Sequence, residues 1–389
     1  MTGFLEGNRV DLLETGDAYF PALEAAIAAA RHEVHLETYL FADDPTGRRV
    51  AGALAAAARR GVAVRVLVDG FGAANLLPSL RAVLEPAGVR IQVFRPERAR
   101  FRLRRHRLRR MHRKLVVIDG GIGFCGGINV LDDRDGRGDG PPRFDFAVRV
   151  TGPVVADMHR AVRRLWMLVR WTTLGRIART GPPTAPALTS AGAGGQRVAF
   201  LTRDNLRHRR SIEEAYLVAI SRAREEIFIA CAYFLPSRGF RDALREARRR
   251  GVRVRLLLQG VPEYPFVRHA MRAFYRDFVR EGIEVHEYLT TFLHAKVAVI
   301  DGLWATVGSS NIDPFSLMLS REANVVVEDP GFARELRGSL ERALHAGGIR
   351  VSEGDLVRTP WLERAKSWFA LRLGRAFVGL TGYARREDL

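Results

Sequence analysis

The sequence predicts an α/β protein of two tandem sandwich domains that are related by a pseudo-twofold axis and share one active site. Three observations support this prediction. Segments with helical and strand-like patterns alternate along the chain, which is typical of α/β sandwiches with mixed or largely parallel sheets. The order of these segments in the first half repeats in the second half. One motif of five spaced residues also occurs once in each half, and a repeat of this kind organises a whole fold.

The first half opens with alternating helices and strands. The expected elements are a helix at residues 17–31, a strand at 33–41, an alanine-rich helix at 47–60, an apolar strand at 62–68 and a closing helix at 154–173. Asp17 suits the N-cap of the first helix. On the first strand, His35, Glu37 and Tyr39 share one face, because residues two apart point the same way. Glu37 is thus within reach of the active site, and a position at its rim fits equally well.

The second half repeats this order. The expected elements are a helix at residues 211–224, a strand at 226–234, a helix at 240–250, a strand at 252–258 and a basic, aromatic helix at 266–280. The segment ARRGVAVRVLVDG at residues 58–70 parallels RRRGVRVRLLLQG at 248–260. Core packing is the default role of the aromatic helix, and a lipid-facing wall of the active site is the alternative. His269 within this helix is not expected to be catalytic.

A stretch rich in proline, glycine and alanine predicts the domain boundary. The predicted organisation is a first domain at residues 1–179, a linker at 180–196, a second domain at 197–350 and a basic amphipathic tail at 351–389. The polar loop DDRDGRGDGPPR at residues 132–143 lacks the closing glutamate of a calcium loop. It is therefore interpreted as a flexible surface segment.

The repeated motif is His-x-Lys, four residues, Asp, six residues and Gly-x-x-Asn. The first copy consists of His112, Lys114, Asp119, Gly126 and Asn129, and the second of His294, Lys296, Asp301, Gly308 and Asn311. Each His-x-Lys precedes a run of aliphatic residues, at 115–118 and at 297–300, that predicts a buried strand. On such a strand, the His and Lys of each copy share one face.

Two such copies brought together would form a cavity with two imidazoles and two ammonium groups. The two asparagines could add neutral donors, and this combination suits a phosphate. One histidine can attack phosphorus and form a covalent intermediate, while the other protonates the leaving oxygen and later deprotonates the incoming one. No metal or other cofactor is expected, because the lysines supply the charge that stabilises the developing anion.

Composition singles out the lysines of the motif. Lys and Arg total 62 residues, but only Lys114, Lys296 and Lys366 are lysines, so two of the three lie in the repeat. The alternative is a pair of core strands that each carry an incidental His and Lys. Agreement at five spaced positions in both copies disfavours that interpretation.

The chain resembles the phospholipase D superfamily, which is marked by two HxK-x4-D-x6-G-x-x-N motifs. Further segments resemble bacterial cardiolipin synthases of the short B type, which lack N-terminal transmembrane helices. These segments are GNRVDLLETGDAYFPAL, EVHLETYLF and FDFAVRVTGPVV in the first half, and RDNLRHRRSIEEAYLVAI and ACAYFLPS in the second half. The resemblance extends from about residue 7 to about residue 345.

The resemblance implies a role for each motif residue. His112 would be the nucleophile and His294 the general acid and base. The phosphate would be held by Lys114, Lys296, Asn129 and Asn311. Asp145 and Glu322 lie where the family has a carboxylate bonded to a catalytic imidazole, which fixes the tautomer and orientation of the ring. Asp119 and Asp301 complete the catalytic motif and are interpreted as structural supports rather than phosphate ligands.

The function that the resemblance implies is phosphatidyl transfer between phospholipids through a phosphohistidine, with phosphatidylglycerol as donor and acceptor. A phospholipase D-type hydrolase or a nuclease on the same scaffold is the alternative, because all of these enzymes share the motif. A basic binding protein with an inactive site is a third and weaker alternative, since both motifs are intact.

The net charge of +19 suits a polyanionic partner, either nucleic acid or an anionic membrane. The densest basic tract, at residues 95–113, includes His112 and has Phe101 as its one aromatic residue. Base stacking is therefore disfavoured, and an anionic phospholipid is favoured over nucleic acid. A solvated charged loop is the alternative for this tract.

The sequence also predicts where the protein works. No apolar run marks a signal peptide or a transmembrane helix. The two cysteines, Cys125 and Cys231, lie in apolar segments, as expected for free thiols of a cytosolic protein. An interfacial helix is predicted in the tail from the helical spacing of Trp361, Ala365, Trp368, Phe369 and Arg372. Docking of this tail onto the protein itself is the alternative. We therefore expect a peripheral protein at the cytoplasmic face of the cell membrane.

Overall fold

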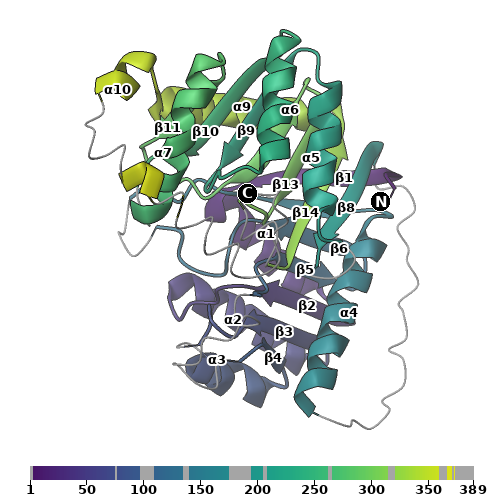
Figure 1. The fold of residues 1–389 in the computed structure, drawn as a ribbon. Coiled ribbons are helices and arrows are strands. Elements are labelled where there is room, and N and C mark those ends of the chain that lie inside the picture. Colours follow the sequence, from purple (N-terminus) through teal and green to yellow (C-terminus); the bar gives the residue numbers. More distant parts are fainter. Residues whose placement is uncertain are drawn as a thin grey trace.

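The computed structural model is a mixed α/β fold of two similar halves (Figure 1). It describes residues 3–74, 77–96, 109–134, 140–174, 194–204, 208–261, 265–313, 320–358, 366–369 and 372. None of the helices in this part of the chain is long and apolar enough to cross a membrane.

The first half contains the elements from β1 to α4. They are β1 (Leu5–Glu14), α1 (Thr15–Ala29), β2 (Glu33–Thr38), α2 (Pro45–Arg59), β3 (Ala63–Asp69), α3 (Leu77–Leu84), a short 3-10 turn (Glu85–Ala87), β4 (Arg90–Phe94), β5 (Lys114–Ile118), β6 (Ile122–Gly126), β7 (Phe146–Thr151) and α4 (Val155–Leu174). The predicted helices and strands of this half are present, with ends displaced by a few residues.

The second half contains the elements from β8 onward. They are β8 (Gln196–Arg203), α5 (Ser211–Arg222), β9 (Glu226–Cys231), α6 (Arg238–Arg249), β10 (Arg253–Gln259), α7 (Pro265–Arg280), β11 (Glu284–Tyr288), β12 (Lys296–Ile300), β13 (Trp304–Gly308), β14 (Glu322–Glu328), α9 (Pro330–Gly347), β15 (Gly348–Arg350) and α10 (Glu353–Arg358). Gln196, predicted as the last linker residue, already belongs to β8.

The described strands form one 15-stranded sheet in the order β15-β11-β10-β9-β12-β13-β14-β8-β1-β7-β6-β5-β2-β3-β4. Outward from the β8–β1 junction, corresponding strands follow in the same order on both sides: β8, β14, β13, β12, β9, β10 and β11 in the second half match β1, β7, β6, β5, β2, β3 and β4 in the first. On both sides, the strand after the His-x-Lys motif lies antiparallel to the first strand of a parallel group. The predicted α/β fold with a pseudo-twofold repeat is therefore confirmed.

The strands of the two halves pack against each other around a shared core. This core includes Leu115 and Val148 from the first half and Val297 and Val325 from the second, with α4 and α9 beside it. The outer faces are covered by α1 to α3 in one half and by α5 to α7 in the other. Burial of this apolar surface, at about 25 cal/mol per Å², fixes the two halves relative to each other.

The predicted N-cap of the first helix is wrong. Helix α1 begins at Thr15, directly after β1, and no side chain caps it. Asp17 lies in its first turn and pairs with Arg134 at 2.7 Å. The free backbone donors are satisfied from elsewhere, because Asp133 accepts from the Gly16 N–H and the Asp145 carbonyl accepts from the Thr15 N–H.

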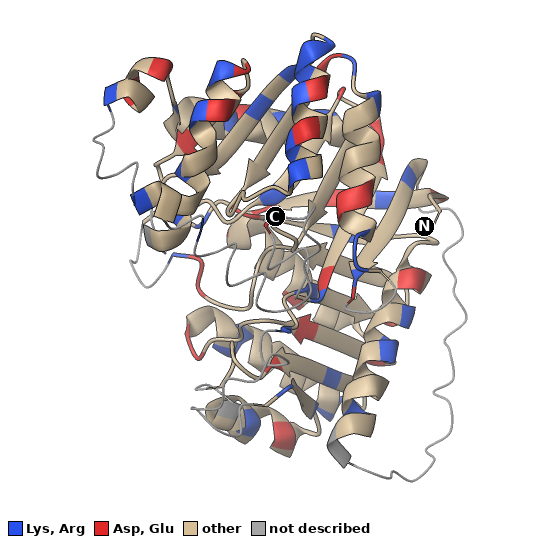
Figure 2. Ribbon diagram, viewed as in Figure 1, with Lys and Arg blue, Asp and Glu red and all other residues tan. Residues whose placement is uncertain are grey.

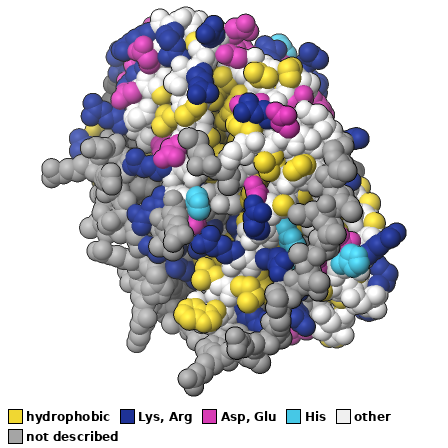
Figure 3. Space-filling view, turned by 90° about the vertical axis from the view of Figure 1, so that its right-hand side faces the viewer, with side chains coloured by type: hydrophobic (Ala, Val, Ile, Leu, Met, Phe, Trp, Pro, Cys, Tyr) yellow, Lys and Arg dark blue, Asp and Glu magenta, His cyan; other side chains and the backbone are white. Residues whose placement is uncertain are grey.

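Several sequence predictions concern segments outside the described residues. They are most of the basic tract, at residues 97–108, the centre of the polar loop at 135–139, most of the linker at 175–193 and most of the tail at 359–365, 370–371 and 373–389. Elsewhere, charged residues are spread along both halves (Figure 2). On the face in Figure 3, Lys and Arg side chains gather near the middle, with His side chains among them.

Candidate active site

The two motif histidines lie immediately before the central strands of the two halves, where the halves meet. His112 precedes β5, and its N–H donates to the Arg321 carbonyl at 3.0 Å. His294 precedes β12, and its N–H donates to the Phe144 carbonyl at 2.9 Å. Isolated parallel bridges join Met111 to Arg321 and Phe144 to Leu293. Each histidine is therefore positioned by a segment of the opposite half.

The residue after each of these carbonyls is the carboxylate partner of the histidine. Nδ1 of His112 lies 3.0 and 3.2 Å from the two carboxylate oxygens of Glu322. Nδ1 of His294 lies 2.6 Å from Oδ2 of Asp145. The pairing is crossed between the halves, which spacing along the sequence does not reveal. In each ring, an Nδ1–H donor to the carboxylate leaves the Nε2 lone pair for chemistry.

The motif lysines are buried beside the histidines. Lys114 Nζ donates to the His112 carbonyl at 2.7 Å and lies 3.3 Å from Nε2 of the same residue. Lys296 Nζ donates to the His294 carbonyl. Each lysine also lowers the pKa of the histidine in the opposite half through its charge. The four groups therefore share one electrostatic environment.

The motif asparagines are buried in the same region. Asn129 Oδ1 accepts from the Leu40 N–H at 3.1 Å, which directs its carbonyl oxygen to the backbone. Asn311 Oδ1 lies 4.0 Å from the Cys231 thiol. A cavity of about 20 Å³ is lined by Asn129, Arg143, Asp145, His294 and four further residues. Asn129 of the first copy and His294 of the second thus border one space.

The motif aspartates bind backbone instead. The Asp119 carboxylate accepts from the N–H groups of Arg31, His32 and Glu33 at 2.8 Å each. Asp301 accepts from Arg224, Glu225 and Glu226 at 2.8 to 3.0 Å. Both aspartates have positive φ angles, of 50° and 51°. They tie the end of the motif strand to the start of its neighbour, on the side away from the histidines.

Burial sets the charge state of the site before an anion binds. It lowers the pKa of His294 to about 3, with Lys296 acting in the same direction and Asp145 opposing. Burial also lowers the pKa of His112 against the effect of Glu322. The pKa of Lys114 falls to about 7 for the same reason, again opposed by Glu322. Both imidazoles are therefore neutral near pH 7 before an anion binds.

The remaining partner, Asp145, stays ionised. Burial alone would raise its pKa, but Lys296 and His294 lower it overall. An ionised carboxylate at Nδ1 favours a protonated ring once an anionic substrate adds its own negative charge. The arrangement can thus supply both a neutral nucleophile and, with substrate bound, a general acid.

Sequence reasoning missed one group that touches a catalytic partner. Ser309 Oγ donates to Glu322 at 2.5 Å and accepts from the Ala323 N–H at 3.1 Å. The corresponding residue of the first copy is Gly127, where a Cβ atom would overlap the Asp145 carboxylate. The sequence already shows glycine in the first copy and serine in the second at this position of Gly-x-x-Asn. The reason for the difference, contact with Asp145 or with Glu322, is visible only in the fold.

Aromatic rings border both histidines. The Tyr39 ring lies 5.1 Å from the His112 ring, and Lys114 Nζ lies 5.7 Å from the Tyr39 centroid. The Phe292 ring stacks on His294 at 5.9 Å. These rings restrict imidazole orientation and exclude water. The alternation pattern placed Tyr39 on one face with Glu37 without assigning it to the site, and Phe292 had no signal.

Glu37 does not lie at the rim of the site. It is buried and bound in two places by Arg113, the variable residue of the first His-x-Lys, with one N–O distance of 2.9 Å. Arg113 also donates to the Ala161 carbonyl of α4 at 3.1 Å. Burial raises the pKa of Glu37 against the effect of Arg113. This pair anchors the segment that carries His112 to β2 and α4.

Among the described residues, one cluster has metal-ligand chemistry, namely Glu33, His35 and His159. Its groups already bind one another, with His159 Nε2 2.6 Å from Glu33. Arg65 Nη1 lies 2.8 Å from the same carboxylate and 3.1 Å from His35. A fixed guanidinium in the cluster disfavours a cation there, so we interpret it as a buried ion network.

Comparisons with known proteins agree with this geometry. The family described as "Cardiolipin synthase, PLD-like domain" matches residues 23–134 and 216–344. Cardiolipin synthase B of Escherichia coli is 39% identical over 388 residues, covering 97% of this chain and 90% of the relative. The major cardiolipin synthase of Bacillus subtilis is 32% identical over 370 residues, covering 94% of this chain and 74% of the relative.

A solved structure shares the fold. Phosphatidylserine synthase of Haemophilus influenzae superposes with a TM-score of 0.69 at 12% identity, covering 97% of this chain and 96% of the other. Duplicated α/β halves that meet at two His-x-Lys motifs define a protein of the phospholipase D class. Within that class, the chain belongs to the cardiolipin synthase family.

Proposed function

We propose that this protein is a phosphatidyltransferase that converts two phosphatidylglycerol molecules into cardiolipin and glycerol. The observation that carries the proposal is the crossed pairing of each motif histidine with a carboxylate of the opposite half. This pairing builds one site with two imidazoles in matching environments. The cardiolipin synthases that match nearly the whole chain favour phosphatidyl transfer as the reaction of that site.

In the first step, Nε2 of neutral His112 attacks the phosphorus of one phosphatidylglycerol. The bond from phosphorus to the headgroup glycerol oxygen breaks, and that oxygen takes a proton from His294 as glycerol leaves. Glu322 holds Nδ1–H of His112 and stabilises the positive ring in the phosphohistidine. The anionic phosphodiester raises the pKa of His294, which lets it carry the proton that it donates.

In the second step, a headgroup hydroxyl of another phosphatidylglycerol attacks the phosphohistidine. Neutral His294 accepts the hydroxyl proton, the new P–O bond forms and the P–N bond to His112 breaks. The products are cardiolipin and regenerated His112, and His294 holds the proton until the anionic product leaves and its pKa falls again. The phosphodiester energy is conserved in the intermediate, so no nucleotide is consumed.

Lys114 and Lys296 place two cations beside the developing charge on the phosphate oxygens, and Asn129 and Asn311 add amide donors. Asp119 and Asp301 act at a distance, by fixing the ends of the motif strands. Transfer to a lipid hydroxyl competes with transfer to water. The aromatic walls Tyr39 and Phe292 reduce access of water to the two rings.

The proposed setting is a peripheral position at the cytoplasmic face of the membrane. The net charge of +19 suits an anionic lipid surface, and the scarcity of aromatic residues in the basic tract disfavours nucleic acid. The proposed domains are residues 1–179 and 197–350, joined by the linker at 180–196, of which Gln196 already begins β8, and followed by the tail at 351–389.

Incubation of the purified chain with phosphatidylglycerol liposomes tests the proposal. Cardiolipin and glycerol in equal amounts are expected, and the His112→Ala variant should form neither. Phosphatidic acid as the sole lipid product would instead make the protein a hydrolase. Cleavage of a nucleic acid without any lipid product would favour the nuclease alternative.

A further inference from the structure

Helix α4 carries a stripe of exposed residues that becomes apolar toward its C-terminal end. The stripe consists of Arg160, Arg164, Met167, Leu168 and Trp171, which recur at helical spacing and so lie on one side of the helix. Met167, Leu168 and Trp171 are 55%, 42% and 74% exposed. Large apolar side chains that are exposed together mark an interaction surface.

The same part of the helix is strongly basic. From residue 158 to residue 174 it has no acidic residue and four arginines, which are Arg160, Arg163, Arg164 and Arg170. Arg160 pairs with Asp157 in the first turn of the helix. Arg164, in the middle of the stripe, is exposed and forms no ion pair with any described residue. The apolar residues are therefore accompanied by positive charge that α4 itself does not balance.

Further cations lie where the inner side of α4 meets the end of β4. Phe94 packs against α4, and the guanidinium groups of Arg95 and Arg321 lie 5.5 and 5.8 Å from the centre of its ring. Arg321 forms no ion pair within the described ranges, and its Nε is buried without a hydrogen-bond partner. The acidic groups that act on it, Glu37 and Asp204, each contact a different basic side chain. Figure 3 shows the side of the molecule on which α4 lies, with Lys and Arg side chains above a group of hydrophobic ones.

The inner side of α4 supports the segment that carries His112. The α4 residues Leu165, Trp166 and Val169 form one buried cluster with Met111, which directly precedes His112, and with Phe94. The basic tract at residues 97–108, which contains six arginines and one glutamate, follows Phe94 and precedes Met111 by two residues each. This tract therefore begins and ends beside α4, next to the catalytic segment.

We propose that the exposed side of α4 docks on a bilayer that contains anionic phospholipid. Met167, Leu168 and Trp171 enter the interfacial region, and the arginines of the helix contact the headgroup phosphates. An apolar stripe with tryptophan and flanking arginines suits such a surface, and the negative charge of the lipid complements the unbalanced cations. The inference rests on the proposed phospholipid substrate, because it specifies which face of the enzyme meets the membrane that holds this substrate.

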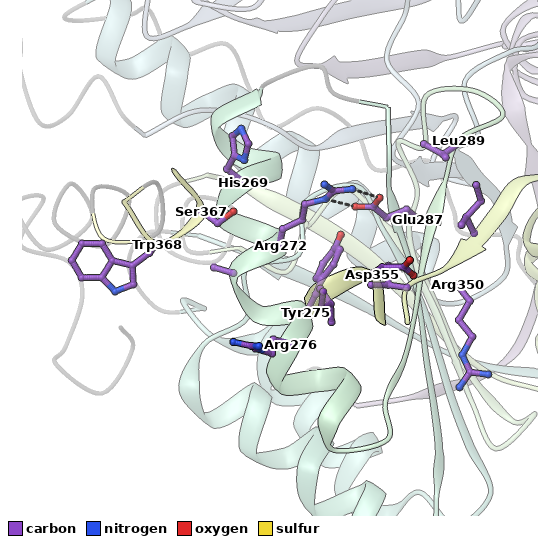
Figure 4. Close-up of a pocket in the computed structure, with 14 residues that line it drawn as sticks. His269, Arg272, Tyr275, Arg276, Glu287, Leu289, Arg350, Asp355, Ser367 and Trp368 are labelled. Carbon is purple, nitrogen blue, oxygen red and sulfur yellow. Dashed lines mark hydrogen bonds and ion pairs between the residues drawn. The ribbon is translucent and has the colours of Figure 1, made fainter. Parts of the chain in front are cut away.

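A second exposed tryptophan provides a comparison. Trp368 is 58% exposed and lines a cavity of about 480 Å³ on the outer side of the second half (Figure 4). Arg272 in that lining is bound in two places by Glu287, at 2.9 and 2.6 Å. Trp368 thus lies on a different part of the surface, where a carboxylate already binds a neighbouring arginine.

Binding is measured with the full chain carrying His112→Ala, so that no lipid is consumed. Its co-sedimentation with phosphatidylcholine vesicles that contain phosphatidylglycerol should weaken at least about tenfold in a Leu168→Glu/Trp171→Glu variant, because two anions replace apolar contacts at a negative surface. The matched control, Ala82→Glu/Val83→Glu, makes the same change of charge at exposed positions of α3, which covers the opposite face of the sheet. It should bind within about twofold of the parent, since it lies away from the docking face.

Vesicles with brominated acyl chains identify the tryptophan that enters the lipid, because bromine quenches indole fluorescence on contact. We expect Trp171→Phe to remove at least half of the quenching and Trp368→Phe to remove less. Quenching that is lost in Trp368→Phe and retained in Trp171→Phe would overturn the proposal. So would equal binding of the parent and the α4 variant, or equal binding to vesicles of phosphatidylcholine alone. Circular dichroism and thermal unfolding establish that each variant is folded.

Activity separates docking from catalysis. In a chain with intact His112, Leu168→Glu/Trp171→Glu should slow cardiolipin formation on vesicles at least about fivefold, because less enzyme is bound to the lipid surface. On short-chain phosphatidylglycerol dissolved as monomers, the same variant should act like the wild type. Equal losses on both substrates would mean that the helix end supports the active site and not docking. Absence of product from the wild-type chain on both would refute the proposed function and leave the binding results standing.

Discussion

At the scale of single residues, each imidazole depends on a carboxylate that the other half supplies. Replacing Glu322 by Gln keeps the shape of the side chain but no longer stabilises a positive His112 ring. We expect kcat to fall by up to about 10⁴-fold, the loss that follows when the aspartate of a histidine triad is changed to the amide. Glu328→Gln, six residues further along β14 and paired with Arg197, serves as the control and should change kcat less than twofold. Equal effects of both substitutions would contradict the role given to Glu322.

Lys114 should make anion binding depend on pH. Its pKa of about 7 means that the ammonium loses its proton as the pH rises through 7, a range in which His294, with a pKa of about 3, does not titrate. Sulfate, which does not titrate in this range, should therefore bind more weakly at pH 8.5 than at pH 6, by about threefold to tenfold. Isothermal titration of the wild-type chain measures this change, and Lys114→Met should make the pH dependence clearly smaller. A similar pH profile in Lys114→Met would rule out this lysine as the titrating group.

At the scale of elements, the register between neighbouring strands positions the carboxylate partners of the histidines. Gly126 and Ala147 are paired between β6 and β7, so Gly127 lies against Asp145 just beyond the strand ends. Gly127→Ala would push the Asp145 carboxylate off His294, and we expect a loss of activity of about 10- to 100-fold. Gly121→Ala, in the turn before β6 with open space around its Cβ, is the control. Activity measured on phosphatidylglycerol liposomes distinguishes the two, and a harmless Gly127→Ala would refute the steric argument.

The periodic elements could be predicted from sequence because each is a local pattern. The apolar run after Lys114 and the one after Lys296 are buried strands, and the alanine-rich helix and the basic, aromatic helix lie where the sequence pattern placed them. Asp17 failed as an N-cap because β1 runs straight into α1, and a loop distant in sequence satisfies the helix donors. The N-cap rule considers only neighbouring residues, so it cannot predict such a contact.

For the candidate site too, the sequence predicted which residues are involved but not the contacts between distant residues. Spacing indicated which side chains belong together, since His, Lys and Asn recur at fixed intervals in both copies. The crossing of Glu322 to His112 and of Asp145 to His294 depends on how the halves pack. The contact of Phe292 with His294 is local, but Phe292 belongs to no motif. These contacts join residues far apart in the chain or lie outside any motif, so no spacing predicts them.

At the scale of the whole molecule, both histidines of one site come from one chain. The β8–β1 junction and the shared core join the halves within the chain. An equimolar mixture of His112→Ala and His294→Ala proteins should therefore regain no activity above the sum of the two alone. Recovery toward a quarter of the wild-type rate would show that chains exchange halves, because random exchange regenerates some intact sites.

The central claim is that the two halves create a single site in which His112 becomes covalently phosphatidylated. Rapid acid-free denaturation of the protein during turnover of phosphatidylglycerol, followed by proteolysis and mass spectrometry, tests it most directly. The account predicts a phosphatidyl adduct on the peptide that contains His112, and its absence in His112→Ala. An adduct on His294, or cardiolipin formed at full rate without any adduct on His112, would contradict it.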